Sequence, residues 1–300
     1  MDVVTGAFGY IGKYIAQRLL ALGRQVRTIT THPGKDNPFG QAVAAFPYHF
    51  DDPTHLTESL QGCGTLYNTY WVRFDYGNWS FERALANTRT LFECARQAGV
   101  KRIVHVSVTN PCEDDDLPYY RGKAIQEKLV KECGLDYCIL RPTLVFGVED
   151  ILVNNIAWTI RKFPVVPVFG SGTYRLQPVF VEDLAALAVD CAGEAESQVL
   201  DAVGPQTFTY EAFLREIAAG LDRRLIFLHV PPRFGIWLGK LIGWFVHDVM
   251  LTQDELEGLM REKLTSSQSP NCPTQFTAWL RENKDVLGTN YTSELKRHFW

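Results

Sequence analysis

Three side chains in the middle of the chain have the types and spacing for carbonyl reduction or alcohol oxidation. Ser107 lies at the end of the apolar run RIVHVSV, and Tyr119 and Lys123 follow in the stretch YYRGK. A tyrosine and a lysine four residues apart share one face of a helix. The lysine cation lowers the pKa of the tyrosine, which passes a proton to the developing alkoxide, while the serine hydroxyl orients the carbonyl oxygen. Tyr120 is the alternative proton donor, since either tyrosine could face the site.

A glycine-rich turn near the start of the chain has the spacing of a phosphate cradle. Gly6, Gly9 and Gly12 stand in TGAFGYIG, between an apolar run and an apolar helical stretch. The first glycine allows a sharp turn, the second lets a pyrophosphate approach the backbone, and the third lets helix and strand pack closely. Helix N–H groups and the positive end of the helix dipole attract phosphates. In this context the motif predicts a bound dinucleotide.

The end of the next apolar run bears on which dinucleotide is bound. A carboxylate about 20 residues beyond the glycines would hold the ribose 2′-hydroxyl of NAD. Here the run QVRTIT ends in Thr30, Thr31 and His32, and Lys35 follows, with no carboxylate before Asp36. Because hydroxyl and cationic groups suit a 2′-phosphate, the sequence favours NADP over NAD.

Short apolar runs alternate with amphipathic helical stretches through the first half of the chain. The predicted helices span residues 11–22, 53–60, 81–98 and 119–132. Such alternation predicts a parallel sheet with helices on both faces and ligands at the carboxyl ends of its strands. We therefore expect an α/β fold with a doubly wound parallel sheet and a small, mostly helical C-terminal lobe.

The alternation loosens after Gly147, which sets the expected domain boundary. The predicted dinucleotide-binding domain is residues 1–150, with 175–192 returning to its sheet as a strand and helix. Residues 151–174 and 193–300 form the predicted substrate lobe. The apolar stretch from Phe234 to Val246 is expected to be a buried helix of that lobe or a dimer contact, with an interfacial membrane helix as the alternative.

Composition excludes several classes of protein. The formal net charge of −4 gives no basic footprint, so nucleic acid is not an expected partner. The seven cysteines form no CxxC pair and no signal peptide precedes the first strand, which predicts reduced thiols in a cytoplasmic protein. The histidines have no i, i+4 pair and no carboxylate cluster around them, so no metal site is expected. No transmembrane segment is expected either.

Four stretches, taken in order, resemble the short-chain dehydrogenase/reductase superfamily of the extended or atypical type. They are TGAFGYIG, NTRTLFECARQAGVKRIVHVS, YYRGKAIQEKLVKECGLDYCILRPTLVFG and LQPVFVEDLAALAV, and the resemblance covers roughly residues 3–192. It implies a dinucleotide-binding Rossmann fold with Ser107, Tyr119 and Lys123 at the catalytic positions, and Asn87 at the position of a supporting helix asparagine. The cofactor contacts that follow are Thr5, Gly6, Gly9, Tyr10, Ile11, Gly12, Thr30, Thr31, His32, Phe50, Asn68, Lys123 and Pro142.

The chain departs from the pattern of this superfamily at two places. The family often has an aspartate on the adenine after the third strand, where this chain has His49. Small residues usually follow the fourth strand, where this chain has Tyr70 and Trp71. These bulky residues line a flat substrate pocket or crowd out catalysis. Some atypical members, similar to fungal nitrogen-regulator sensors and to an accessory subunit of respiratory complex I, bind a dinucleotide without evident turnover.

The expected function is hydride transfer between a nicotinamide, of NADP by preference or of NAD, and a carbonyl or alcohol carbon of an unidentified small molecule. The first alternative is a non-catalytic redox sensor or assembly factor that acts through a protein partner. The second is a sugar-nucleotide epimerase or dehydratase, for which Arg161, Arg175 and Arg215 are too scattered to form a diphosphate pocket. A homodimer or another protein partner is also compatible with the sequence.

Overall fold

The computed structural model describes residues 1–231, 248 and 252–295, so the predicted apolar helix from Phe234 to Val246 lies outside the described residues. The chain divides into two compact units. Unit 1 is Met1–Pro142 with Val181–Ala202, and unit 2 is Thr143–Phe180 with Val203–Trp300. The first boundary falls after Pro142, earlier than the expected residue 150.

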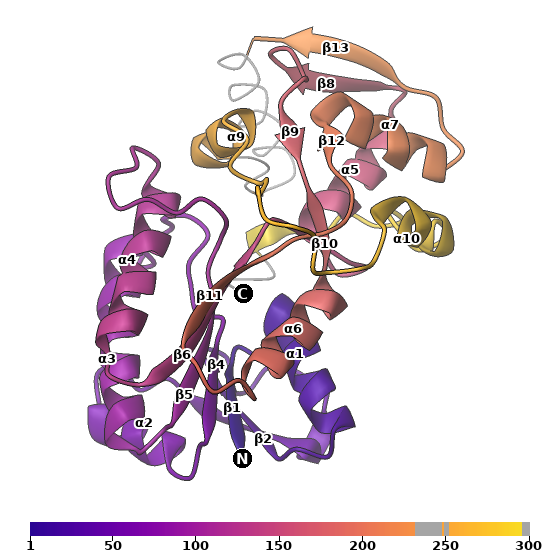
Figure 1. Cartoon of the computed structure of the whole chain (residues 1–300). Coiled ribbons are helices and arrows are strands. Elements are labelled where there is room, and N and C mark those ends of the chain that lie inside the picture. Colours follow the sequence, from indigo (N-terminus) through magenta and orange to yellow (C-terminus); the bar gives the residue numbers. More distant parts are fainter. Residues whose placement is uncertain (232–247, 249–251, 296–300) are drawn as a thin grey trace. The chain divides into compact units, whose positions relative to one another are not determined.

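Unit 1 is built on a seven-stranded parallel sheet (Figure 1). Its strand order is β11-β6-β5-β4-β1-β2-β3. The registers are regular, with Val3 opposite Arg27 on β2 and Leu66 opposite Ile103 on β5. The strands are β1 (Asp2–Thr5), β2 (Val26–Thr30), β3 (Val43–Pro47), β4 (Thr65–Asn68), β5 (Arg102–Val106), β6 (Asp136–Pro142) and β11 (Gln198–Ala202).

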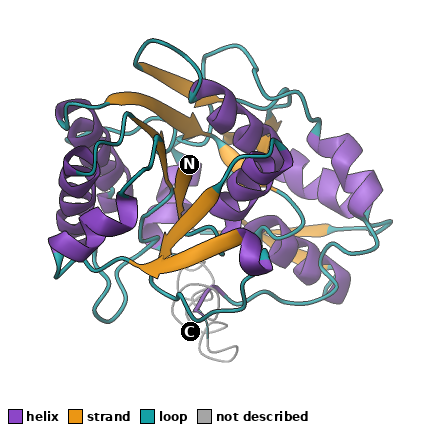
Figure 2. Cartoon of the chain, turned by 90° about the horizontal axis from the view of Figure 1, so that it is seen from below, coloured by secondary structure: helices purple, strands orange, loops and turns teal. Residues whose placement is uncertain are grey.

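Helices cover both faces of this sheet, so the expected doubly wound α/β fold is confirmed. One face carries α1 (Tyr10–Ala21) and α6 (Val181–Cys191), which pack on each other. The other carries α2 (Pro53–Leu60), α3 (Phe81–Gln97) and α4 (Pro118–Glu132), packed in that order. Figure 2 distinguishes the helices, strands and connecting loops by colour.

Local sequence signals explain where the helices near the site begin. Ser80 caps α3 by accepting a hydrogen bond from the Arg83 amide at 3.1 Å. Pro118 opens α4, where a proline sacrifices no helical hydrogen bond. The first helix, α1, has Gly9 as its N-cap residue, which provides no side-chain cap, and it buries its apolar face through Ile15 and Leu19. Its first-turn N–H groups are therefore not capped by a side chain.

The segment expected to return to the sheet does so differently from the prediction. Residues 181–191 form α6 on unit 1, but the strands at 175–180 belong to unit 2. The outer strand of the sheet is instead β11, which pairs with β6 from Gln198 opposite Cys138 to Ala202 opposite Pro142. Its sequence QVLDA is short and half-polar, which is why it gave no clear strand signal.

Unit 2 combines helices with three two-stranded sheets that the sequence did not predict. Its core includes Phe146, Phe213, Phe276 and Trp279, whose rings pack against one another. No described helix is long and apolar enough to cross a membrane. The helices are α5 (Ile151–Lys162), α7 (Tyr210–Gly220), α9 (Gln253–Met260) and α10 (Phe276–Asn283). The strands are β7 (Leu144–Phe146), β8 (Val165–Phe169), β9 (Arg175–Leu176), β10 (Pro178–Phe180), β12 (Phe208–Thr209) and β13 (Ile226–Val230).

Candidate functional site

The strand order of unit 1 reverses direction between β1 and β4. In open α/β sheets, ligands bind outside the carboxyl ends of the strands at such a switch point. The glycine turn follows β1, and Thr69, Tyr70 and Trp71 follow β4. Both segments flagged by the sequence therefore emerge at the place where this fold forms a crevice.

The glycine turn has the backbone of a phosphate cradle. Gly6 adopts a left-handed conformation with φ of +65°, and its carbonyl oxygen accepts a hydrogen bond from the Gly9 amide at 2.8 Å. A Cβ on Gly12 would lie 2.4 Å from the Gly6 oxygen, so only glycine lets α1 approach the turn. Gly9 is exposed and is the N-cap residue of α1, whose first turn contains no acidic residue. A pyrophosphate would fit the positive end of this helix.

Buried polar contacts tie the turn to the neighbouring strand ends. The Thr5 hydroxyl donates to Asn68 Oδ1 at 3.2 Å and accepts from the Thr69 amide at 2.7 Å. The Asn68 amide Nδ2 lies 2.9 Å from His105 Nδ1. Thr5, Asn68 and His105 are all fully buried. Of the expected cofactor contacts, Thr5 and Asn68 thus hold strand ends together by their side chains.

His105 is held in the neutral form. Its pKa lies well below the usual value, first because burial disfavours the imidazolium and then because the Lys123 cation lies nearby. With Nδ1 facing Asn68, a neutral ring placed this way carries its proton on Nε2. The ring edge packs against Phe92, with centroids 6.3 Å apart. His105 is therefore a packed residue of the strand.

The end of β2 is polar and carries no carboxylate. Thr30 is buried, and its hydroxyl accepts a hydrogen bond from the His32 amide at 3.2 Å. Thr31 is exposed, whereas His32 is half-buried. His32 Nε2 is a buried ring nitrogen with no hydrogen-bond partner among the described residues. These three residues fit a 2′-phosphate, because a buried donor without a partner is satisfied by an added oxygen.

Phe50, an expected cofactor contact, belongs to an aromatic cluster with Tyr48 and Tyr70. Its ring stacks on Tyr48, with centroids 4.7 Å apart and planes 12° apart, and it lies 5.2 Å from Tyr70. Asn87 on α3 donates a hydrogen bond to the Tyr70 hydroxyl at 2.8 Å. Asn87 therefore supports Tyr70, the bulky residue that replaces a small one in this chain.

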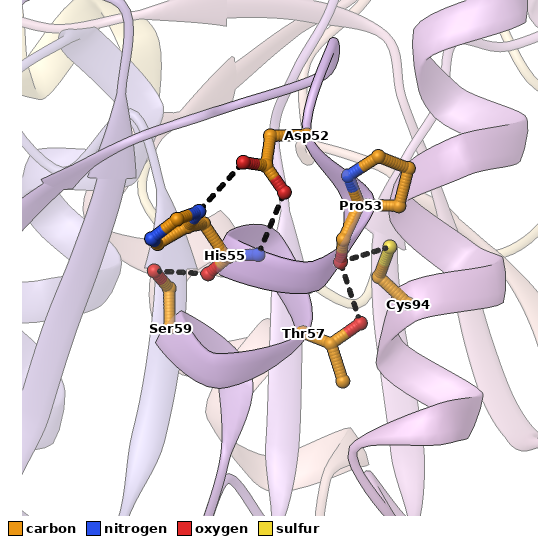
Figure 3. A network of polar contacts seen from close by, with 6 residues as sticks. All are labelled: Asp52, Pro53, His55, Thr57, Ser59 and Cys94. Atoms are coloured by element: carbon orange, nitrogen blue, oxygen red, sulfur yellow. Dashed lines mark hydrogen bonds and ion pairs between the residues drawn. The ribbon is translucent and has the colours of Figure 1, made fainter.

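The loop that carries Phe50 is fastened at the start of α2 (Figure 3). Asp52 accepts a hydrogen bond from the His55 amide at 3.2 Å and contacts the His55 ring at 2.6 Å. The thiol of Cys94 on α3 reaches the Pro53 carbonyl at 3.4 Å. His49, at the position of the expected aspartate, is exposed and takes a left-handed φ of 45°. The imidazole of His49 thus replaces a carboxylate at this position.

Ser107 is held by a buried ion pair that the sequence analysis missed. The Ser107 hydroxyl donates to Glu127 Oε1 at 2.7 Å. Both oxygens of Glu127 also accept hydrogen bonds from Arg141, at 2.8 and 2.6 Å. Because Glu127 is paired with a guanidinium, its carboxylate is an acceptor, and the single proton of Ser107 is committed to it. In this arrangement the Ser107 hydroxyl can only accept a hydrogen bond from a ligand. The expected role of orienting a carbonyl oxygen requires Ser107 to donate its proton, which Glu127 already accepts.

Lys123 lies beneath the ring of Trp71. Its Nζ donates to the Val106 carbonyl at 3.0 Å and lies 5.1 Å from the indole centroid. The side chain is 4% exposed, and burial lowers its pKa to about 7. A Cβ on Gly122 would come within 2.6 Å of Trp71 Cη2, so the missing side chain at this position makes room for the indole.

Tyr119 and Tyr120 differ in their surroundings. Tyr119 is half-buried, and its ring centroid lies 6.4 Å from both Trp71 and Phe81. Trp71 and Phe81 stack on each other at 5.5 Å. Tyr120 is 4% exposed in a small cluster with Val108. Tyr119 is thus the tyrosine that shares the Trp71 surroundings with Lys123.

The remaining expected contacts surround the same strand ends. Tyr10, in the first turn of α1, packs edge-on against Tyr14 at 5.8 Å, and Ile11 beside it is half-buried. Pro142 ends β6, and its carbonyl accepts a hydrogen bond from the Thr109 amide at 3.1 Å. The structure therefore places these residues at or next to the carboxyl edge of the sheet.

A model of the NAD dependent epimerase/dehydratase family matches residues 3–200. The chain belongs to this family. The resemblance to extended short-chain dehydrogenases/reductases, which include this family, is thereby confirmed. Membership also supports NAD(P) binding by the fold, without deciding between NAD and NADP.

One relative of this chain is a subunit of a mitochondrial NADH dehydrogenase. Subunit 9 of the mitochondrial NADH dehydrogenase [ubiquinone] 1 alpha subcomplex from Rattus norvegicus is 26% identical over 279 residues, 89% of this chain and 73% of that protein. Because that relative is mitochondrial, a cytoplasmic location remains only a prediction for this chain.

Solved structures share the fold. An NADPH-dependent quinone oxidoreductase from Escherichia coli, in complex with NADPH, superposes with a TM-score of 0.77 at 20% identity, covering 96% of this chain and 99% of that one. A nucleoside-diphosphate-sugar epimerase from Staphylococcus aureus gives a TM-score of 0.76 at 13% identity, with coverage of 94% and 100%. At these identities the likeness establishes the fold alone.

Burial of Lys123 makes a prediction about pH. Its folded pKa of about 7 lies below the usual 10.5, so between these values the unfolded chain binds the proton and the folded chain does not. The contribution of this group to the free energy of unfolding therefore rises with pH across that window and is constant below it. Urea unfolding of wild type and Lys123→Met at several pH values measures this. The free energy of unfolding of wild type minus that of Lys123→Met should increase from about pH 7 upward, by at most about 1.4 kcal/mol per pH unit. A difference that does not change with pH would show that the ammonium is solvated.

Proposed function

We propose that this protein binds NAD(P)H at the glycine turn and reduces the carbonyl group of a flat small molecule, with Tyr119 as proton donor. The observation that supports this most is that Tyr119 and Lys123, one turn apart on α4, both contact the indole of Trp71. A proton donor, a cation and an aromatic surface thus meet after β4, at the switch point of the sheet. The aromatic pair of Trp71 and Phe81 suits a planar substrate such as an aryl ketone or a quinone.

The glycine turn, Lys123 and Tyr119 have distinct roles in this proposal. The turn at Gly6, Gly9 and Gly12 would hold the pyrophosphate, and Lys123 would hold the ribose beside the nicotinamide. A bound nicotinamide would supply the hydride. Tyr119 would give its phenolic proton to the carbonyl oxygen as negative charge develops there. The Lys123 cation would favour this transfer by stabilising the phenolate that remains.

We also propose that NADP is preferred to NAD. The support is the buried Nε2 of His32, which has no partner among the described residues, in a segment whose neighbouring residues Thr30 and Thr31 carry hydroxyls. Isothermal titration with NADPH and NADH, side by side, should give tighter binding of NADPH by about tenfold or more, the energy of one charge-assisted hydrogen bond. His32→Ala should remove most of this difference and leave NADH binding unchanged. Equal affinities in wild type would refute the preference.

A second candidate function is dinucleotide binding without turnover, in service of a protein partner. Two observations favour it. The Ser107 proton is given to Glu127, and the Lys123 ammonium is bonded to the Val106 carbonyl, so both polar groups are already engaged by protein. The relation to a subunit of a multisubunit dehydrogenase is compatible with this candidate. Tight NADPH binding together with no oxidation of NADPH by any carbonyl or quinone would favour it over the reductase.

A sugar-nucleotide substrate has less support in unit 2. Three arginines that a diphosphate would need are each bonded to protein. Arg161 donates to the Leu287 carbonyl at 2.9 Å, and Arg175 pairs with Glu262 at 2.7 Å. The Arg215 guanidinium lies over the Phe227 ring at 4.4 Å. We therefore do not propose an epimerase or dehydratase reaction for this chain.

A further inference from the structure

Exposed apolar side chains gather in one region of unit 2. The described residues include eight large apolar side chains that are exposed, and five of these lie in the segments 161–165, 222–228 and 284–287. A soluble surface normally scatters such residues singly, so a group of them marks an interaction site. The five are Phe163, Val165, Ile226, Leu228 and Val286.

Hydrogen bonds bring these three segments together. The Ile226 amide donates to the Pro164 carbonyl at 2.8 Å, at the start of the β8–β13 ribbon. Arg161 donates to the carbonyls of Leu287 and Lys284, and the Lys284 ammonium lies 3.2 Å from Asp222. The strands of the ribbon run side by side in Figure 1. The three segments therefore form one surface, which we call the basic–apolar patch.

The β8–β13 ribbon is apolar on both faces. Val166 and Phe227 point into the core of unit 2. On the other face, Val165 stands opposite Ile226, and Leu228 follows two residues later. Ile226 is 63% exposed and Leu228 is 54% exposed. A strand face turned to water normally carries polar residues, so this face is built for contact with something apolar.

The segments that carry these apolar side chains are rich in cationic residues. The three segments contain five cationic residues and two carboxylates, in a chain whose formal charge is −4. One of the carboxylates, Asp222, is paired with Lys284. Lys162, which precedes Phe163, and Arg223 and Arg224, which precede Leu225 and Ile226, are all exposed. The patch thus has the opposite sign to the whole chain, which favours an anionic occupant.

We propose that the basic–apolar patch docks on the surface of an anionic lipid bilayer. Apolar side chains that enter the headgroup region and cations that attract acidic lipids are the two contributions that bind proteins to such surfaces. A second copy of this chain, related by two-fold symmetry, would place the cations against themselves. Ordinary protein interfaces are depleted in lysine, whereas this patch contains two. The proposal is independent of the dinucleotide site.

Sedimentation of the full chain with lipid vesicles tests the proposal. Vesicles of phosphatidylcholine mixed with phosphatidylserine should bind wild type, and vesicles of phosphatidylcholine alone should bind it far more weakly. Arg223→Ser and Arg224→Ser should each lower the partition coefficient about fivefold, because each cation contributes separately at an anionic surface. The double variant Ile226→Ser with Leu228→Ser should lower it by about tenfold or more. The matched control is Leu22→Ser, which replaces a residue of unit 1 that is 55% exposed and should leave binding unchanged.

Three results would overturn the proposal. The first is no binding to either kind of vesicle, and the second is equal binding to both. The third is full binding by the Ile226→Ser, Leu228→Ser variant, which would assign lipid binding to residues outside the patch. Analytical ultracentrifugation of wild type and this variant measures whether the patch forms a dimer contact instead. A dimer that only wild type forms, without vesicle binding, would assign the patch to a second copy.

Discussion

Gly9→Val is expected to abolish dinucleotide binding while the protein stays folded. A Cβ at this position would lie 3.1 Å from the Gly6 oxygen, a tight contact that small shifts relieve. The two methyl groups beyond it would occupy the space in front of the α1 N-terminus, where the pyrophosphate must approach the backbone. Affinity for NADPH by calorimetry should fall about a hundredfold or more, equivalent to about 3 kcal/mol.

Gly64→Val is the matched control for this prediction. It makes the same substitution just before β4, at the opposite end of the strands, where a Cβ would meet only the Met1 carbonyl at 3.7 Å. Its affinity for NADPH should match that of wild type. An unchanged affinity in a folded Gly9→Val protein would show that the dinucleotide is not bound at this turn.

Tyr119→Phe is expected to lower the rate of carbonyl reduction by roughly 100- to 10,000-fold, the usual contribution of general acid–base catalysis. The substitution removes the phenolic proton and keeps the ring against Trp71, so affinity for NADPH should hardly change. Steady-state oxidation of NADPH against a panel of aldehydes, ketones and quinones measures the rate.

Tyr120→Phe serves as the control, because Tyr120 is 4% exposed and its side chain is buried in a cluster with Val108 and Leu117. Its rate should stay within about twofold of wild type, a difference below 0.5 kcal/mol. The reverse result, a slow Tyr120→Phe and an active Tyr119→Phe, would mean that the proton comes from the other tyrosine of the pair.

The fold of unit 1 was predictable because its signals are local. The apolar runs, the glycine turn and the helix starts at Ser80 and Pro118 each act over a few residues, and their alternation permits few topologies. β11 gave no such signal, because QVLDA becomes a strand only by pairing with β6. A strand was expected at the start of 175–192, where β9 and β10 lie, but the two-stranded sheets of unit 2 were not predicted. Strand pairing across many residues outweighs weak local preference.

The candidate site was predictable in its residue types and only partly in their contacts. The spacing placed Tyr119 and Lys123 on one helix face, and the structure brings both to Trp71. The bond between Ser107 and Glu127 joins residues 20 positions apart on different elements, so spacing alone could not reveal it. One sign was present, because Glu127 lies four residues after Lys123 and therefore on the same face of α4.

Transfer of deuterium from the cofactor tests the central proposal most directly. NADPH that carries deuterium at both hydrogen positions of C4 of the nicotinamide is incubated with the protein and a panel of aldehydes and ketones, and the alcohols formed are analysed by mass spectrometry. We expect deuterium on the carbinol carbon with wild type, and about a hundredfold less or lower with Tyr119→Phe under the same conditions. Tight NADPH binding by wild type with no deuterium in any alcohol would contradict the proposal that this protein transfers hydride to the carbonyl carbon of an aldehyde or ketone.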